Sequence, residues 1–210
     1  MTQLGEDRFG ILFVCHANLC RSPLAERLAQ RALHDAFGPV AGAVRVSSAG
    51  THAFEAPAMH RGSAAVLAEC GIDAGGFTSR RLREPMVANA DLVLAAGREQ
   101  RAACVSLAPS ALRRTFTLRQ FTRLVAAVRP APDLVAGPVP RRLRVLVERV
   151  QDTRHLVPAV PADEDDLPDP VNQPIEAFRD CAAEIWESFG AVVAAVAEPR
   201  RDSGNFIAGS

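Results

Sequence analysis

A cysteine and an arginine with five residues between them could bind and attack a phosphate ester. Residues 14–23 read Val-Cys-His-Ala-Asn-Leu-Cys-Arg-Ser-Pro, which places Cys15 and Arg21 in one short segment. A cysteine thiolate is a strong nucleophile, and a guanidinium can contact two phosphate oxygens at once, which a lysine cannot. Ser22 could donate a hydrogen bond to the thiolate when it leaves, and Asn18 could tie the segment together. These residue types at this spacing predict nucleophilic chemistry on a phosphate dianion.

The flanking sequence predicts a strand before this segment and a helix after it. Residues 10–15 form a short apolar run, typical of a buried parallel strand, and Pro23 suits the first turn of a helix. The apolar face of that helix is marked by Leu24, Leu28 and Ala32. Backbone N–H groups of a loop that enters a helix point at a bound anion. Cys15 would therefore lie at the floor of a phosphate cradle, where the helix dipole and Arg21 stabilise its thiolate.

Strands and helices alternate along most of the chain, which predicts a parallel sheet covered by helices on both faces. Further strands are expected at residues 44–47, 91–95 and 115–118. Helices are expected at residues 60–69 (ending at Gly71), 98–106, 124–128, 141–150 and 174–196. The predicted fold is a three-layer α/β/α domain with a four-stranded parallel sheet and the ligand at the carboxyl ends of the strands.

One domain over residues 1–197 accommodates these elements, with a proline-rich and helical segment inserted at about 129–162. Residues 198–210 contain Gly and Ser and are expected to be a flexible tail. The acidic residues at 163–166 are interpreted as a solvated charge cluster. The 210 residues are 48% hydrophobic and 23% charged, as in soluble globular proteins.

Charge and targeting signals exclude several classes of function. The 24 basic and 24 acidic residues balance, so no global field attracts nucleic acid or a membrane surface. The apolar run at 11–15 is too short to span a bilayer, and no basic segment precedes it as in a signal peptide. Five cysteines, an odd number, indicate no disulfide framework, so we expect a reducing, cytoplasmic location. Cys15, His16 and Cys20 lack a further Cys or His pair at ligand spacing, so no metal or cofactor is expected.

The segment around Cys15 resembles the signature loop of the low-molecular-weight protein tyrosine phosphatases, which share their fold with one class of arsenate reductases. The resemblance covers roughly residues 9–125 and 163–197. Weaker matches follow in the order of the family, at residues 47–51, 70–73, 79–82, 90–94, 114–118 and 169–170.

This resemblance implies a two-step phosphoryl transfer on a phosphotyrosine protein or a small phosphomonoester, with inorganic phosphate as the product. Cys15 would form a cysteinyl-phosphate, Arg21 and the loop amides would stabilise the transition state, and Asp169 would act as general acid and base. Cys20 matches a second loop cysteine that can form a reversible disulfide with the nucleophile. The substrate-binding residues implied by the match are His16, Ala17, Asn18, Leu19, Cys20 and Ser22.

Some residues depart from the pattern of the family, and they concern the substrate. Ala17 stands where the family most often has Gly, and His16 would line the mouth of the pocket. Val171 and Asn172 follow the Asp-Pro pair, where an aromatic residue usually holds the phosphotyrosine ring. Phe54 could supply another wall of the pocket or pack in the core.

Two alternatives to a phosphatase stay open from the sequence. An arsenate reductase needs two further cysteines close together, whereas Cys70, Cys104 and Cys181 are widely separated. A phosphate-binding module without turnover would also keep the loop.

Overall fold

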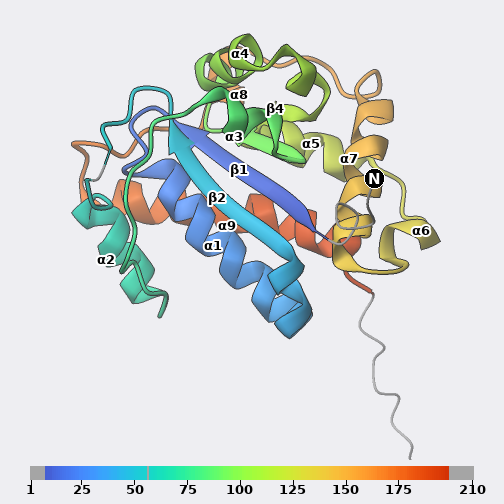
Figure 1. The fold of residues 1–210 in the computed structure, drawn as a ribbon, viewed down its shortest axis with the longest axis horizontal. Coiled ribbons are helices and arrows are strands. Elements are labelled where there is room, and N and C mark those ends of the chain that lie inside the picture. The colour runs from blue at the N-terminus through green and yellow to red at the C-terminus, as the bar shows by residue number, and fades with distance from the viewer. Residues whose placement is uncertain (1–7, 56, 199–210) are drawn as a thin grey trace, which may run out of the picture.

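The computed structural model describes residues 8–55 and 57–198, so the predicted tail lies almost entirely outside the described residues. Its centre is a four-stranded parallel sheet in the order β2-β1-β3-β4 (Figure 1). The strands are β1 (Phe9–Cys15), β2 (Val44–Gly50), β3 (Leu92–Ala95) and β4 (Thr115–Thr117). Cys15 pairs with Gly50 and Val14 with Ala95, so the last residues of three strands meet at one edge.

Helices cover both faces of this sheet, which confirms the predicted three-layer α/β/α fold. Alternate residues of β1 point to opposite faces, as the pleat requires. Ile11 and Phe13 belong to the larger apolar cluster, whereas Leu12 and Val14 belong to the smaller one. The larger cluster lies under α1 (Arg21–Phe37), α5 (Leu118–Ala127) and α9 (Ile175–Val196), and the smaller lies under α3 (Glu84–Ala88) and α4 (Arg98–Leu107).

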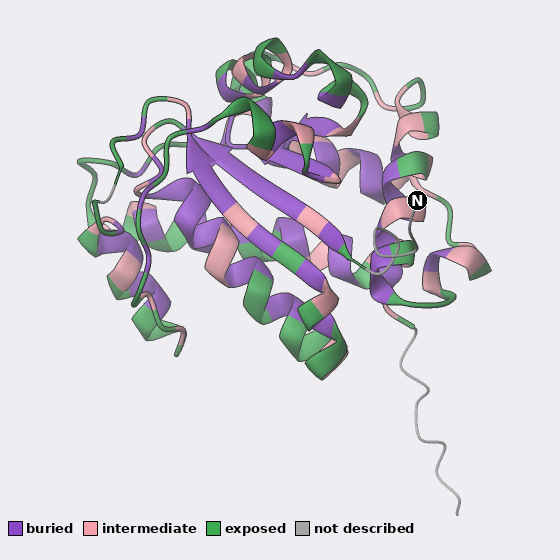
Figure 2. Ribbon diagram, in the orientation of Figure 1, coloured by how far each residue is buried: buried purple, intermediate pink, exposed green. Residues whose placement is uncertain are grey.

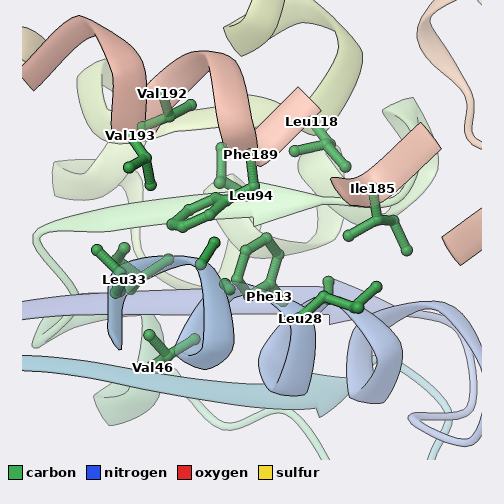
Figure 3. Packing of buried hydrophobic residues seen from close by; sticks show 14 of the residues in the cluster. Phe13, Leu28, Leu33, Val46, Leu94, Leu118, Ile185, Phe189, Val192 and Val193 are labelled. Carbon is green, nitrogen blue, oxygen red and sulfur yellow. The ribbon is translucent and has the colours of Figure 1, made fainter. Parts of the chain in front are cut away.

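The larger cluster is the main core. Phe13 from β1 and Leu94 from β3 point at Phe189 and Ile185 of α9, and Leu28 of α1 closes the cluster (Figure 3). The Phe13 and Phe189 rings meet edge to face, with centroids 5.9 Å apart. Figure 2 shows β1 and the inner faces of α1 and α9 as almost continuously buried. This burial on both faces explains why the two central strands, β1 and β3, read as apolar runs.

The predicted boundary between the fourth strand and the next helix is wrong, whereas the predicted end of α2 agrees with the structure. Residue 118 was expected to end the fourth strand, with a helix from 124, but the strand ends at Thr117 and α5 begins at Leu118. The Thr117 hydroxyl accepts a hydrogen bond from Gln120 N at 3.1 Å and so caps the helix. At the end of α2 (Arg61–Glu69), Gly71 adopts φ +68°, as expected for the glycine that ends a helix.

The segment at 129–162 packs against the main core instead of lying over the carboxyl edge of the sheet. It contains α6 (Pro132–Val135) and α7 (Val139–Thr153), which contact α5, α9 and the beginning of β1 (Figure 1). Leu143 and Leu146 of α7 are fully buried in the larger cluster. Within residues 8–55 and 57–198, no helix combines the length and apolar composition needed to cross a lipid bilayer.

Candidate active site

The loop between β1 and α1 lies at the carboxyl edge of the sheet, and neighbouring segments bind its carbonyl groups. Thr51 N donates to Cys15 O at 3.0 Å, and His52 N donates to His16 O at 2.8 Å. In contrast, within the described ranges the backbone N–H groups of Ala17, Leu19 and Cys20 donate no hydrogen bond. Free N–H groups at the beginning of a helix form an anion-binding site.

Cys15 is buried and receives two hydrogen bonds at its sulfur. The Ser22 hydroxyl donates to Sγ at 3.0 Å, and Asn18 N donates to Sγ at 3.3 Å. Donors of this kind stabilise a thiolate more than a thiol. The sulfur therefore lies beside the amino terminus of α1, with two hydrogen-bond donors directed at it.

Asn18 connects the loop to two other parts of the chain. It is buried and adopts φ +54°, a left-handed conformation that Asn tolerates better than most residues. Its Nδ2 donates to Ser22 Oγ and to Ser48 Oγ, both at 2.9 Å, and its Oδ1 accepts from Arg80 N at 2.8 Å. Ser48 in turn donates to Glu26 Oε2 at 2.6 Å. Ser48 and Arg80 lie in the segments 47–51 and 79–82 that match the family, whereas Glu26 had no signal in the sequence.

Gly50, at the end of β2, lies directly against the loop. A Cβ at this position would be 2.6 Å from Asn18 N and 2.7 Å from His16 O, so only glycine fits. Ala17 itself needs no special conformation, because among the described non-glycine residues only Asn18 and Asn172 have positive φ.

Arg21 and Asp169 are brought together although they are 148 positions apart. The Arg21 Nη2 group forms an ion pair with Asp169 Oδ2, and its Nη1 donates to Leu167 O at 3.1 Å. The Arg21 Nε is buried and has no hydrogen-bond partner among the described residues. Asp169 is partly exposed, with 38% of its side chain accessible, so it faces both solvent and Arg21.

The acidic segment before Asp169 is not a solvated charge cluster, which corrects the sequence-based interpretation for Asp165. Asp165 is buried and forms ion pairs with Arg98 and Arg123. Asp166, beside it, accepts a hydrogen bond from Arg98 N at 2.7 Å. Only Asp163 and its neighbour Glu164 are exposed as expected.

Cys20 is the residue before α1 and is buried beside the loop. Burial, followed by the nearby Asp169 and Cys15, raises the pKa of the Cys20 thiol to about 12. Cys20 is therefore a neutral thiol at neutral pH. Both loop cysteines are free in this structure, and the disulfide between them stays a prediction.

Two imidazole rings lie beside the loop at the surface. The His16 and His52 rings stack with centroids 4.5 Å apart and an interplanar angle of 21°. Phe54, two residues beyond His52, is 83% exposed and so does not belong to the core. Among the described residues, no group of three or more His, Cys, Asp or Glu side chains could hold a metal ion.

Comparison with known proteins fits this geometry. A sequence model of the low molecular weight phosphotyrosine protein phosphatases matches residues 10–130. The chain belongs to this family. It is therefore a phosphatase, a hydrolase of phosphate esters, and the predicted family and enzyme class are confirmed.

Relatives within the family differ in their named substrates. The chain is 34% identical over 111 residues to the low molecular weight protein-tyrosine-phosphatase Etp of Escherichia coli K12, covering 53% of this chain and 70% of Etp. It is 37% identical over 113 residues to a protein-arginine-phosphatase of Geobacillus stearothermophilus, covering 54% of this chain and 71% of that protein. Among solved structures, the T. tengcongensis low molecular weight protein tyrosine phosphatase superposes with a TM-score of 0.63 at 25% identity, covering 89% of this chain and 98% of that one.

Proposed function

We propose that this phosphatase cleaves phosphotyrosine in proteins through a cysteinyl-phosphate, with Cys15 as the nucleophile. The observation that carries the proposal is the convergence on Cys15 Sγ of the Ser22 hydroxyl and the amino terminus of α1, with the Arg21–Asp169 pair alongside. This constellation contains a nucleophile, an anion cradle and a proton donor.

In the first step the Cys15 thiolate attacks phosphorus, so that an S–P bond forms while the P–O bond to the leaving group breaks. The phosphate oxygens replace Asp169 at Arg21, and Asp169, which enters the step protonated, gives its proton to the departing oxygen. The free N–H groups of the loop and the Arg21 guanidinium stabilise the charge on the three equatorial oxygens. The buried Arg21 Nε, which has no partner among the described side chains, is available for one of these oxygens.

In the second step water attacks the cysteinyl-phosphate and Asp169 takes its proton. The S–P bond breaks, inorganic phosphate forms, and the Cys15 thiolate is released. The Ser22 hydroxyl, 3.0 Å from Sγ, stabilises the thiolate as a leaving group. Neither step needs a metal or a cofactor. A catalytic thiol needs reducing conditions, which supports the cytoplasm as the place of action.

Phosphoarginine is the second candidate substrate, because one relative is named a protein-arginine-phosphatase. A substrate guanidinium would need an unpaired carboxylate at the mouth of the site. The side chains of His16 and His52 instead stack beside the loop, and Glu55 is already paired with Arg83. Flat imidazole rings suit an aromatic substrate ring better than a cation, so phosphotyrosine is favoured.

Hydrolysis of p-nitrophenyl phosphate in EDTA, compared between wild type, Cys15→Ser and Asp169→Asn, tests the proposal. We expect Cys15→Ser to lower kcat by about 10³-fold or more, because the nucleophile is lost. Asp169→Asn should have a smaller effect with this good leaving group and a larger one with phenyl phosphate. A folded Cys15→Ser variant that retains activity would overturn the assignment of the nucleophile. Peptides carrying phosphotyrosine or phosphoarginine would then be compared by kcat/KM, and a preference for phosphoarginine would overturn the substrate.

A further inference from the structure

Asp165 is the one carboxylate among the described residues that is buried, with 5% of its surface accessible. It ends the short helix α8 (Ala162–Asp165), four positions before Asp169. A buried carboxylate is costly unless charged partners and hydrogen bonds compensate for the lost water. The burial of Asp165, so close in the chain to the proposed proton donor, must therefore be compensated by its contacts.

Each oxygen of Asp165 is paired with a different arginine. Oδ2 accepts from Nε of Arg98 at 2.8 Å and lies 2.7 Å from its Nη2, while Oδ1 pairs with Nη2 of Arg123. Arg98 is the first residue of α4 and Arg123 lies in α5, so Asp165 links two helices that are separate in the chain. Arg98 also donates from its Nη2 to Val160 O at 2.5 Å, which fixes the approach to α8.

The residues between Asp165 and Asp169 continue this attachment towards the loop. Asp166 Oδ1 accepts from Arg98 N at 2.7 Å, and Leu167 N donates to Ala96 O at 2.7 Å. Leu167 O then accepts from Arg21 Nη1 at 3.1 Å. Pro168 and Pro170 flank Asp169 and restrict the backbone dihedral angles around it. A displacement of the backbone at Asp165 therefore moves Asp169 as well.

We propose that Asp165 is a positioning residue, which holds the 165–169 segment through Arg98 and Arg123 so that Asp169 can transfer a proton to the leaving oxygen. This inference rests on the proposed role of Asp169 as general acid. Proton transfer requires hydrogen-bond distance to the leaving oxygen, and a misplacement of about 1 Å can cost about 10²-fold in rate. We call the ion pairs of Asp165 with Arg98 and Arg123 the clamp. The loop that carries Cys15 is held by other residues, so loss of the clamp weakens acid catalysis and leaves the nucleophile in place.

Asp165→Asn tests this inference, with Asp163→Asn as the matched control. Asp163 lies in the same short helix, is exposed, and only its main-chain oxygen is used, by Arg119. For Asp165→Asn we expect kcat/KM, which reports the first step alone, to fall about tenfold for phenyl phosphate and to change by less than about twofold for 2,4-dinitrophenyl phosphate, which needs little protonation. Asp163→Asn should match wild type with both esters.

The double variant Asp165→Asn/Asp169→Asn separates positioning from a merely structural role. If Asp165 acts through Asp169, the double variant is no slower with phenyl phosphate than Asp169→Asn alone. Equal losses with both esters, or a double variant slower than Asp169→Asn, would overturn the inference. If Asp169→Asn itself shows no dependence on the leaving group, the proposed acid is wrong, which is a different failure. If Asp165→Asn does not fold, Arg98→Ala is tested in its place. A loss of rate with phenyl phosphate but not with 2,4-dinitrophenyl phosphate supports the clamp, and a ratio of the two rates equal to that of wild type overturns it.

Discussion

The phosphate loop at residues 15–22 and the acid segment at 163–170 meet at Arg21, but they are held in different ways. The loop is fixed by neutral hydrogen bonds around Asn18 and by the close approach of Gly50. The acid segment is fixed mainly by guanidinium–carboxylate pairs around Asp165. The loop must leave N–H groups free for a dianion, and the side-chain hydrogen bonds of Asn18 hold it without using those of Ala17, Leu19 and Cys20. The acid segment has no such constraint, so arginines can hold it.

Gly50→Ala is expected to have the largest effect, because the added methyl group would push against the backbone of the loop. The added Cβ would lie within 2.8 Å of three backbone atoms of the loop, which cannot move aside as a flexible side chain would. We expect kcat/KM for p-nitrophenyl phosphate to fall about 100-fold and the free energy of unfolding to fall by about 3 kcal/mol. Activity assays and urea denaturation measure both.

Gly10→Ala is the matched control in the neighbouring strand. A Cβ at Gly10 finds its nearest atoms at 3.7 Å, an ordinary contact, so its activity should equal that of wild type. Near-normal kinetics in Gly50→Ala would mean that the loop tolerates displacement and that its tight fit is unimportant.

Asn18→Ala is expected to have an intermediate effect, and Asn18→Gly divides it into two parts. Both variants lose the hydrogen bonds to Ser22, Ser48 and Arg80, but glycine keeps φ +54° without strain. We expect Asn18→Ala to lower kcat about 30-fold and Asn18→Gly about tenfold, a difference equivalent to about 0.7 kcal/mol. Equal losses in the two variants would show that the hydrogen bonds alone hold the loop.

Titration of Cys20, on the loop side, is expected to have the smallest effect near neutral pH, because it changes the stability of the protein only above about pH 9. Its pKa is raised from 9.0 in the unfolded chain to about 12 in the folded protein. Between these values the unfolded state has lost the proton and the folded state still holds it. The stabilisation is complete below pH 9 and falls by at most about 1.4 kcal/mol per pH unit as the pH rises towards 12.

Urea midpoints at several pH values would show this dependence, and Cys20→Ala should remove the part of it that comes from Cys20. Burial also raises the pKa of Cys104, in the smaller apolar cluster, to about 12. Cys104→Ala should therefore remove a similar slope without changing activity. If Cys20→Ala keeps the full slope, the thiol is not the group that titrates.

The loop and the sheet could be predicted from the sequence because their signals are local. Apolar runs at 10–15 and 91–95 mark strands that are buried on both faces, and one stretch of ten residues contains the whole anion cradle. The family match confirmed the predicted family, and the anion-binding role of the loop stays a prediction.

The clamp on the acid segment could not be predicted, because its contacts join positions far apart in the chain. Asp165 meets Arg98 across 67 positions and Arg123 across 42, and neither pairing leaves a pattern in one sequence. A run of acidic residues normally indicates a solvated surface, which was wrong for Asp165. The start of α5 was misplaced for a local reason. Leu118 directly follows Thr115–Thr117 and reads as a further strand residue, and the hydrogen bond from Gln120 N to the Thr117 hydroxyl shows that the helix begins there.

The inserted helices α6 and α7 lie away from the loop that carries Cys15. These helices join the core near the beginning of β1, whereas Cys15 lies at the other end of that strand. In the turn between them Gly137 adopts φ +82°, which a side chain would strain, but its neighbour Ala136 is exposed. A fluorescent label or an affinity tag placed in this turn would leave the entrance for substrate clear. The molecule therefore offers a handle for immobilisation or imaging at a distance from the reaction it performs.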